Sequence, residues 1–238
     1  MHDTPVILLP GTLCTAAVFA HQVEALEAAG ATVEVVQFGA LDSIGAMVDL
    51  VAEHVAPMQQ IALAGFSMGG MVATAFAGRH PERVDRLALL NSKVQADPRT
   101  RRAQRRQYVL EARRSSMRQV MERGFLRNYL HHQDPGHREL ILSMADRSGV
   151  AAFEAQAKAL AERPDLGRTL ANLDCPVLIL GAEQDMLCPP AEQIGMHETA
   201  RQSRLVMLEE CGHFAVLERP DAVNEALLAW YRGEGYSR

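Results

Sequence analysis

A serine stands between two glycines in the stretch GFSMG at residues 65–69, a pattern of the form G-x-S-x-G. A hydroxyl group is a weak nucleophile at neutral pH, so an acyl-transferring serine needs a base, an acid that orients the base, and donors for an oxyanion. An apolar run at 61–64 precedes the motif and a helical pattern at 68–79 follows it. Because the motif works at a strained strand-to-helix turn, this context predicts that Ser67 is a nucleophile rather than an incidental residue of a glycine turn.

Histidine is the side chain best suited to act as the base, and His213 is the best candidate among nine histidines. It follows the apolar run at 205–208 and precedes the last helical pattern. His80 ends a helical pattern on the opposite edge and is expected to be structural. Three further histidines belong to a long insertion, where they either line a pocket or lie in solvated loops: His131, His132 and His137.

An acid that orients His213 should also leave the end of a strand. Asp185 does so, because it lies four residues after the glycine that ends the apolar run at 177–180. Glu183 is a close neighbour, and Asp97 is the remaining substitute. The order Ser67, Asp185, His213 along the chain is the one expected for an α/β-hydrolase arrangement and not for other serine-protease arrangements.

Two backbone N–H groups are expected to form the oxyanion hole. One belongs to Met68, directly after the nucleophile, and the other to Thr12, in the loop after the first apolar run. The same regions offer apolar side chains for a substrate pocket, which are Leu13, Phe66, Phe125, Tyr129 and Leu130.

The elements that position these residues alternate along the chain. Six short runs, apolar on both faces, predict buried strands at 6–9, 33–36, 61–64, 87–90, 177–180 and 205–208. Helices are predicted at 15–29, 43–56, 68–79, 190–200 and 220–231, with Asp42 or Ser43 capping the second. This alternation is typical of an α/β fold with a mostly parallel six-stranded sheet covered by helices on both faces.

More than 80 residues separate the fourth and fifth runs, which is far beyond a usual connection. We therefore expect a core domain formed by residues 1–93 and 169–238, and a helical insertion at 94–168. Within it, Leu110, Met117, Met121 and Gly124 are expected to share one helix face. A second face is strongly cationic and carries Arg102, Arg105, Arg106, Arg113 and Arg114.

Composition limits the classes of protein to consider. The chain has 238 residues, 48% apolar content and a formal charge of −5, so no global positive field points to nucleic acid or to an anionic membrane. No basic leader with an apolar stretch and no membrane-length apolar run is present, so a cytoplasmic location is expected. Four cysteines without metal-finger spacing are expected to be free thiols.

Together these motifs resemble the α/β-hydrolase superfamily, and in particular its small capped carboxylesterases, over essentially the whole chain. The resemblance rests on LLPG at 8–11, GFSMGG at 65–70, HPERV at 80–84, GAEQD at 181–185 and GHF at 212–214. It implies a sheet order of 2-1-3-4-5-6, residues 94–168 as a cap over the site, and no metal or organic cofactor. The chain departs from the family by having Pro10 where a histidine is common, and by starting at what is usually the third strand.

The implied activity is hydrolysis of a small carboxylic ester or thioester through an acyl-enzyme. Similar family members include esterases that cleave methyl esters of acyl groups on a carrier protein. Residues 97–127 carry ten arginines against three acids, so an acyl-carrier protein or an acidic substrate could dock there; the alternative is a solvated cationic surface. Two other classes remain open: a lyase that uses Ser67 and His213 without an acyl-enzyme, and a ligand receptor on the same fold.

Overall fold

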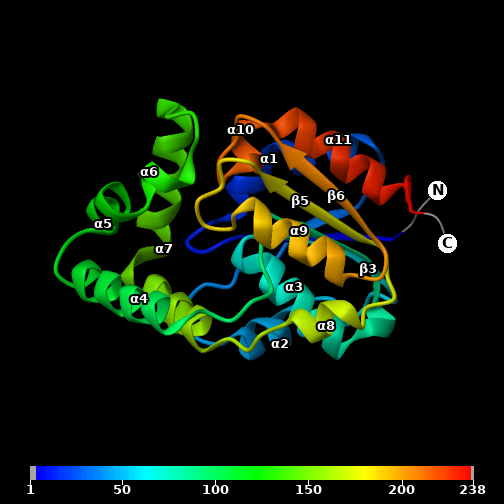
Figure 1. Cartoon of the computed structure of the whole chain (residues 1–238), viewed down its shortest axis with the longest axis horizontal. Coiled ribbons are helices and arrows are strands. Elements are labelled where there is room, and N and C mark those ends of the chain that lie inside the picture. Colours follow the sequence, from blue (N-terminus) through cyan, green and yellow to red (C-terminus); the bar gives the residue numbers. More distant parts are fainter. Residues whose placement is uncertain (1–3, 237–238) are drawn as a thin grey trace.

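Six parallel strands form the centre of the computed structural model, which describes residues 4–236 (Figure 1). Their order is β2-β1-β3-β4-β5-β6, as expected from the sequence. The strands are β1 (Val6–Leu9), β2 (Val33–Val35), β3 (Ile61–Phe66), β4 (Val84–Leu90), β5 (Val177–Ala182) and β6 (Ser203–Leu208). All neighbouring pairs are parallel, so every strand ends at the same edge of the sheet.

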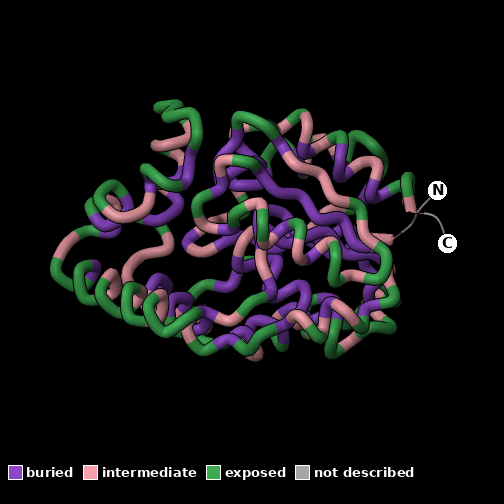
Figure 2. Tube along the Cα trace, in the orientation of Figure 1, coloured by how far each residue is buried: buried purple, intermediate pink, exposed green. Residues whose placement is uncertain are grey.

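Both faces of the sheet are covered because the strands alternate their apolar side chains between two cores. Val6 and Leu8 of β1 point into one core, and Ile7 and Leu9 point into the other. The first core is closed by η1 (Ala16–Phe19), α1 (Ala20–Ala28), α10 (Ala215–Glu218) and α11 (Pro220–Tyr231). The second is closed by α2 (Ile44–His54), α3 (Met68–Arg79), α8 (Gly167–Ala171) and α9 (Pro190–Thr199). Figure 2 shows the buried trace along the sheet.

Helix boundaries follow local signals in the sequence. The Ser43 hydroxyl accepts a hydrogen bond from the Ala46 N–H (3.1 Å) and so caps α2. The bounds of α3 and α11 are those predicted, and a 3₁₀ turn, η2 (Pro81–Arg83), follows α3. The single helix predicted at 15–29 is wrong, because Phe19 leaves the helical region (φ −106°, ψ 14°) and divides it into η1 and α1.

Residues 94–168 connect β4 to β5 through helices. They are α4 (Arg99–Ala112), α5 (Met117–Gly124), α6 (Leu126–Tyr129), α7 (Pro135–Glu162) and the start of α8. A hydrogen bond from the Leu166 N–H to the Val94 carbonyl (2.8 Å) joins the two ends of the insertion. Gly149 has φ 76° and ψ 175°, so α7 is two helices that meet at a kink. In Figure 1, α4, α5 and α6 gather on the side toward which β5 points.

The apolar face predicted for this region is wrong at Leu110. The side chain of Leu110 is 45% exposed, whereas Met117 and Met121 are buried. The chain turns between the end of α4 and Ser116, whose hydroxyl caps α5, so helical periodicity does not continue across that turn. Within residues 4–236, no helix has both the length and the apolar composition needed to cross a membrane.

Candidate active site

Ser67 occupies a strained turn between β3 and α3. Its backbone lies at φ 53° and ψ −115°, a conformation that non-glycine residues rarely adopt. Both flanking glycines permit the close approach of strand and helix. A Cβ atom on Gly69 would overlap the carbonyl group of Leu9, and one on Gly65 would overlap the backbone of Gly69. The turn therefore lifts the Ser67 side chain above the carboxyl edge of the sheet.

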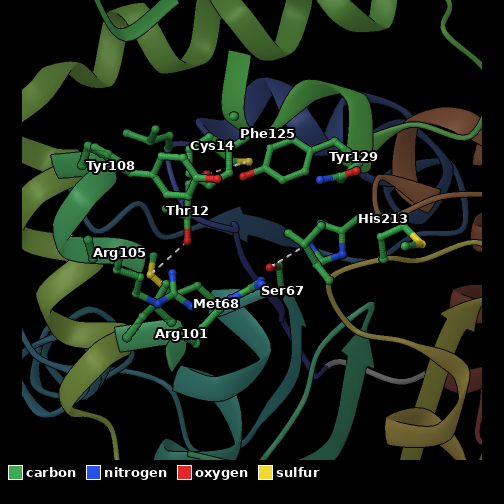
Figure 3. A pocket seen from close by; sticks show the side chains of 18 of the residues that line it. Thr12, Cys14, Ser67, Met68, Arg101, Arg105, Tyr108, Phe125, Tyr129 and His213 are labelled. Carbon is green, nitrogen blue, oxygen red and sulfur yellow. Dashed lines mark hydrogen bonds between the residues drawn. The ribbon is translucent and has the colours of Figure 1, made fainter. Parts of the chain in front are cut away.

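A line of hydrogen bonds connects Ser67, His213 and Asp185 (Figure 3). The Ser67 Oγ lies 2.9 Å from the Nε2 of His213, and the Nδ1 of His213 lies 2.8 Å from the Oδ2 of Asp185. His213 and Asp185 are both 2% exposed. Asp185 is therefore the carboxylate in contact with His213; Glu183 is exposed, and Asp97 forms ion pairs with Arg105 and Arg163 instead.

The Asp185 carboxylate is held by several donors. Its Oδ1 accepts hydrogen bonds from the N–H groups of Leu187 (2.8 Å) and Cys188 (2.9 Å), and its Oδ2 accepts one from the Asn91 side chain (3.0 Å). Burial disfavours the charged form, but His213 and these hydrogen bonds outweigh burial and lower the pKa of Asp185. The carboxylate is thus ionised at neutral pH and fixes the orientation of the imidazole.

Asn91 is a site residue that sequence reasoning missed. Its side chain donates to Asp185 and to the Gly212 carbonyl (3.4 Å), so it joins the loops after β5 and β6. It has a φ of 45° and directly follows β4. Its position in the sequence could have identified it, because it follows a strand that ends at the same sheet edge as the predicted residues.

Backbone strain gathers at this one edge of the sheet. Four non-glycine residues of the described chain have a positive φ: Leu13, Ser67, Asn91 and Glu210. Each follows a different strand, namely β1, β3, β4 and β6. Such strain persists only where surrounding contacts determine it, and it marks this edge as the functional one.

The two predicted oxyanion donors flank Ser67. The Met68 N–H is in the first turn of α3, where the helix itself offers no acceptor. Within residues 4–236, the backbone N–H of Thr12 donates a hydrogen bond to no other backbone group. A side chain of the insertion holds the loop that contains Thr12 in place. Gln156 of α7 accepts from the Leu13 N–H (2.8 Å) and donates to the Gly39 carbonyl (2.7 Å). No local pattern distinguished Gln156 within its helix, so sequence reasoning missed it.

A cavity of about 120 Å³ opens beside Ser67. Four of the five predicted pocket residues line it, which are Leu13, Phe66, Phe125 and Tyr129. Leu130 does not line it: it follows α6 in extended backbone and lines a separate hollow with Arg127 and His131. The Tyr129 ring lies 5.9 Å from the His213 ring, so aromatic side chains shield the catalytic histidine candidate from water.

One face of α4 also lines the cavity, and sequence reasoning missed it. Arg101, Gln104, Arg105 and Tyr108 follow the i, i+3, i+4, i+7 spacing of a single helix face. Of these four residues, only Arg105 was predicted to lie on a cationic face, for which docking of an acidic partner and solvation were both left open. The Gln104 amide contacts the Tyr108 hydroxyl at 3.3 Å, and the Arg105 side chain pairs with Asp97 at 2.5 Å.

The other histidines of the described residues 4–236 lie outside the cavity lining. The His80 ring packs 5.0 Å from Phe76 at the end of α3. The centres of the His131 and His132 rings lie 4.6 Å apart, and the backbone N–H groups of both residues donate hydrogen bonds to the Glu218 carboxylate. His137 belongs to the first turn of α7.

The thiols of Cys14 and Cys188 lie close to the site, but neither is a candidate nucleophile, because burial raises the pKa of both. Burial raises the pKa of Cys14 to about 12, so its thiol stays protonated.

In the described chain, Asp185, Cys188 and His213 form the one group compact enough to hold a metal ion. The donor set does not fit that role, because both nitrogens of His213 are already hydrogen-bonded and burial raises the pKa of the Cys188 thiol.

The fold and the site define an esterase-like α/β hydrolase, and comparison with known proteins agrees. The chain belongs to the alpha/beta hydrolase family, whose model matches residues 6–226. It is 31% identical over 199 residues to a pimeloyl-[acyl-carrier protein] methyl ester esterase of Neisseria meningitidis serogroup B, covering 81% of this chain and 72% of that protein.

Two further relatives extend the comparison. A (E)-2-((N-methylformamido)methylene)succinate hydrolase of Acinetobacter baylyi is 25% identical over 179 residues, which is 74% of this chain and 67% of that protein. The malate-bound structure of a thermophilic esterase from Thermogutta terrifontis superposes with a TM-score of 0.87 at 28% identity, over 97% of this chain and 90% of that one. The expected fold and the expected class of enzyme, an ester-hydrolysing α/β hydrolase, are confirmed.

Proposed function

We propose that this protein hydrolyses a small carboxylic ester through an acyl-enzyme, with Ser67 as nucleophile, His213 as general base and acid, and Asp185 as the orienting carboxylate. The observation that carries the proposal is the hydrogen-bonded line from Ser67 Oγ through both nitrogens of His213 to Asp185. In this geometry a proton can pass from the hydroxyl to the imidazole without a rearrangement of the site.

In the acylation half, the Ser67 Oγ attacks the ester carbonyl carbon while its proton moves to the His213 Nε2. The carbonyl oxygen becomes an oxyanion that the N–H groups of Met68 and Thr12 stabilise. As the tetrahedral intermediate collapses, the bond between the carbonyl carbon and the alcohol oxygen breaks. His213 returns the proton to that oxygen, so the alcohol leaves neutral and the acyl group stays on Ser67.

In the deacylation half, a water molecule takes the place of the alcohol. His213 removes one proton from the water, whose oxygen attacks the acyl carbon, and the same two N–H groups hold the second oxyanion. The bond to the Ser67 Oγ then breaks, and His213 protonates Oγ. The carboxylic acid is released, and the buried Asp185 carboxylate stabilises the imidazolium that forms in both halves.

Residues 94–168 act in this proposal as a cap on a core domain of residues 1–93 and 169–238. Support comes from the cavity lining, to which α4, the region of α5 and α6, and α7 all contribute. The cavity of about 120 Å³ is below the range of roughly 300–1,000 Å³ that is typical of sites for drug-sized ligands. A small acyl or alcohol group fits this volume.

An acyl group on a carrier protein is a candidate form of the substrate. The Neisseria relative is named for an ester of that kind, and the outer surface of α4 to α6 has arginines without an ion-pair partner within residues 4–236, among them Arg99, Arg106, Arg114, Arg123 and Arg127. Because an acidic carrier would be steered by these charges, kcat/KM for a carrier-bound ester should fall as ionic strength rises. Equal kcat/KM at low and high salt contradicts docking on this surface.

Acyl-enzyme formation separates the hydrolase from the alternative lyase. A 4-nitrophenyl ester of a short acid should give a burst of one equivalent of nitrophenolate, and acid quenching should leave the acyl mass on the peptide that contains Ser67. The variant Ser67→Ala should lose both signals and retain the circular dichroism spectrum of the wild type. Undiminished hydrolysis by folded Ser67→Ala protein contradicts the proposed function.

A further inference from the structure

The cavity beside Ser67 has an uneven set of charges. Among residues 4–236, three cationic side chains line it, Lys93, Arg101 and Arg105, and no Asp or Glu does. Hydrolysis of a neutral ester needs no cation here, because the proposed mechanism supplies its oxyanion donors from backbone N–H groups. The charge in the cavity therefore needs a separate explanation.

Two of these cations have partners in the protein. The Lys93 ammonium donates to the Leu187 carbonyl (3.0 Å) and pairs with Glu192 at 3.4 Å. The Arg105 Nε pairs with the Asp97 Oδ2 at 2.5 Å, and its side chain is 18% exposed. Both are thus fixed in place at the cavity wall.

Asp97 does not neutralise Arg105 fully. The Arg163 guanidinium also pairs with Asp97, at 2.9 Å, and both of these side chains are only 1% exposed. One carboxylate therefore serves two guanidinium groups, and the cluster retains one positive charge. Of Asp97, Arg105 and Arg163, which form this cluster, Arg105 is the one that lines the cavity.

Arg101 has no ion-pair partner within residues 4–236. It lies one helical turn before Arg105 on the same face of α4, and both line the cavity. Figure 3 shows the two arginines on the Met68 side of the view and the Tyr108, Phe125 and Tyr129 rings on the other side. Two arginines of one helix face thus line the cavity, and Arg101 is the one without an ion-pair partner in the described part of the chain.

We propose that the substrate is an ester that carries a carboxylate, and that Arg101 and Arg105 bind this carboxylate while Ser67 attacks the ester group. This inference rests on the proposed function and names its substrate class. A guanidinium is the side chain best suited to such a group, because it can donate two parallel hydrogen bonds to a carboxylate. The small cavity favours a short compound with both groups close together.

The carboxylate can belong to the acyl part or to the alcohol part, and matched pairs of esters distinguish the two sources. For the acyl part, monomethyl glutarate is compared with methyl pentanoate, in which a methyl group replaces the carboxylate. For the alcohol part, the butyrate ester of glycolate is compared with ethyl butyrate. In each pair the ratio of kcat/KM for the anionic ester to that for the neutral ester measures the preference.

We expect the wild type to prefer the anionic member of one pair, and Arg101→Gln to reduce that ratio about 10- to 100-fold, the range for a hydrogen bond to a charged group. Arg101→Lys should restore part of the ratio, because it keeps the charge and loses the paired geometry. Arg147→Gln is the matched control: Arg147 is an exposed arginine of α7, outside both the cavity lining and the surface of α4 to α6, so its ratio should equal that of the wild type.

A binding measurement keeps this proposal separate from the proposed catalysis. Glutarate should bind to Ser67→Ala protein in calorimetry, and the additional change Arg101→Gln should weaken that binding by a similar factor. If Ser67→Ala still hydrolyses esters, the proposed function fails but the binding result stands. If the wild type shows no anionic preference in either pair, or if Arg101→Gln leaves the preference unchanged, the carboxylate site is overturned while ester hydrolysis remains.

Discussion

The carboxyl edge of the sheet and the helical insertion each contain a buried aspartate, and they use it differently. Asp185, at the sheet edge, is bound by His213, by Asn91 and by backbone N–H groups, so it orients a side chain that faces Ser67. Asp97, at the base of the insertion, joins Arg105 of α4 to Arg163 beyond α7. The sheet edge thus determines the geometry of the reacting groups, while the insertion determines the charge and shape of the cavity.

The largest expected effect tests the sheet edge alone. Asp185→Asn should lower kcat by about 10⁴-fold, because an amide cannot hold the imidazole in the tautomer that accepts the Ser67 proton. The free energy of unfolding should change much less than the activation barrier. Steady-state kinetics and urea unfolding check both values, and Glu183→Gln, an exposed carboxylate two residues away, is the control that should keep its kcat. A similar kcat in both variants would remove Asp185 from the proposed triad.

The equivalent change in the insertion should lower the free energy of unfolding. Asp97→Asn leaves the buried Arg163 guanidinium without its counter-ion, so the free energy of unfolding should fall by about 3–5 kcal/mol. Burial disfavours the Asp97 anion, but Arg105 and Arg163 outweigh burial and lower its pKa. The stabilisation is therefore present above the ordinary pKa near 3.8 and is lost as pH falls through the lowered value. Urea titrations from pH 7 to pH 3 should show the wild-type advantage shrinking below about pH 4, and a constant advantage contradicts this role.

Two glycines extend the comparison to the backbone. Gly69→Ala would force a Cβ onto the Leu9 carbonyl, so the β1 loop and α3 must separate, at a cost of about 4 kcal/mol or more. Gly149→Ala in α7 meets no atom within 4 Å and costs only the strain of its φ of 76°, about 1–3 kcal/mol. Thermal unfolding of the two variants measures the difference. The reverse order would show that the insertion, and not the sheet edge, is the more tightly packed region.

The smallest expected effect lies within the sheet edge. Asn91→Gly keeps the positive φ and removes one hydrogen bond to Asp185, so kcat should fall about tenfold with little change in KM. Kinetics on one neutral ester give both constants. An unchanged kcat would mean that the backbone donors of Leu187 and Cys188 suffice to position Asp185.

The sequence predicts the sheet edge much better than the insertion, for a physical reason. Strand cores, the bounds of α3, and the contacts among Ser67, Asp185 and His213 follow from short apolar runs and from the rule that parallel strands end at one edge. The contacts of Gln156 and the inward face of Arg101 depend on how helices pack over distances that no local pattern records. Leu110 is exposed because a turn separates α4 from α5, and Leu130 lies in extended backbone after α6; neither irregularity is visible in the apolar pattern.

Gln156 gives the molecule a mechanical property. Its amide bonds the N–H of Leu13 on one side and the carbonyl of Gly39 on the other, so α7, the loop after β1 and the loop after β2 are tied at one point. Any displacement of this part of α7 must either break both bonds or pull the Thr12 loop with it. The wall of the cavity and the backbone beside Ser67 are thereby coupled, so a movement of α7 that keeps the bond to Leu13 also displaces Thr12, the proposed oxyanion donor.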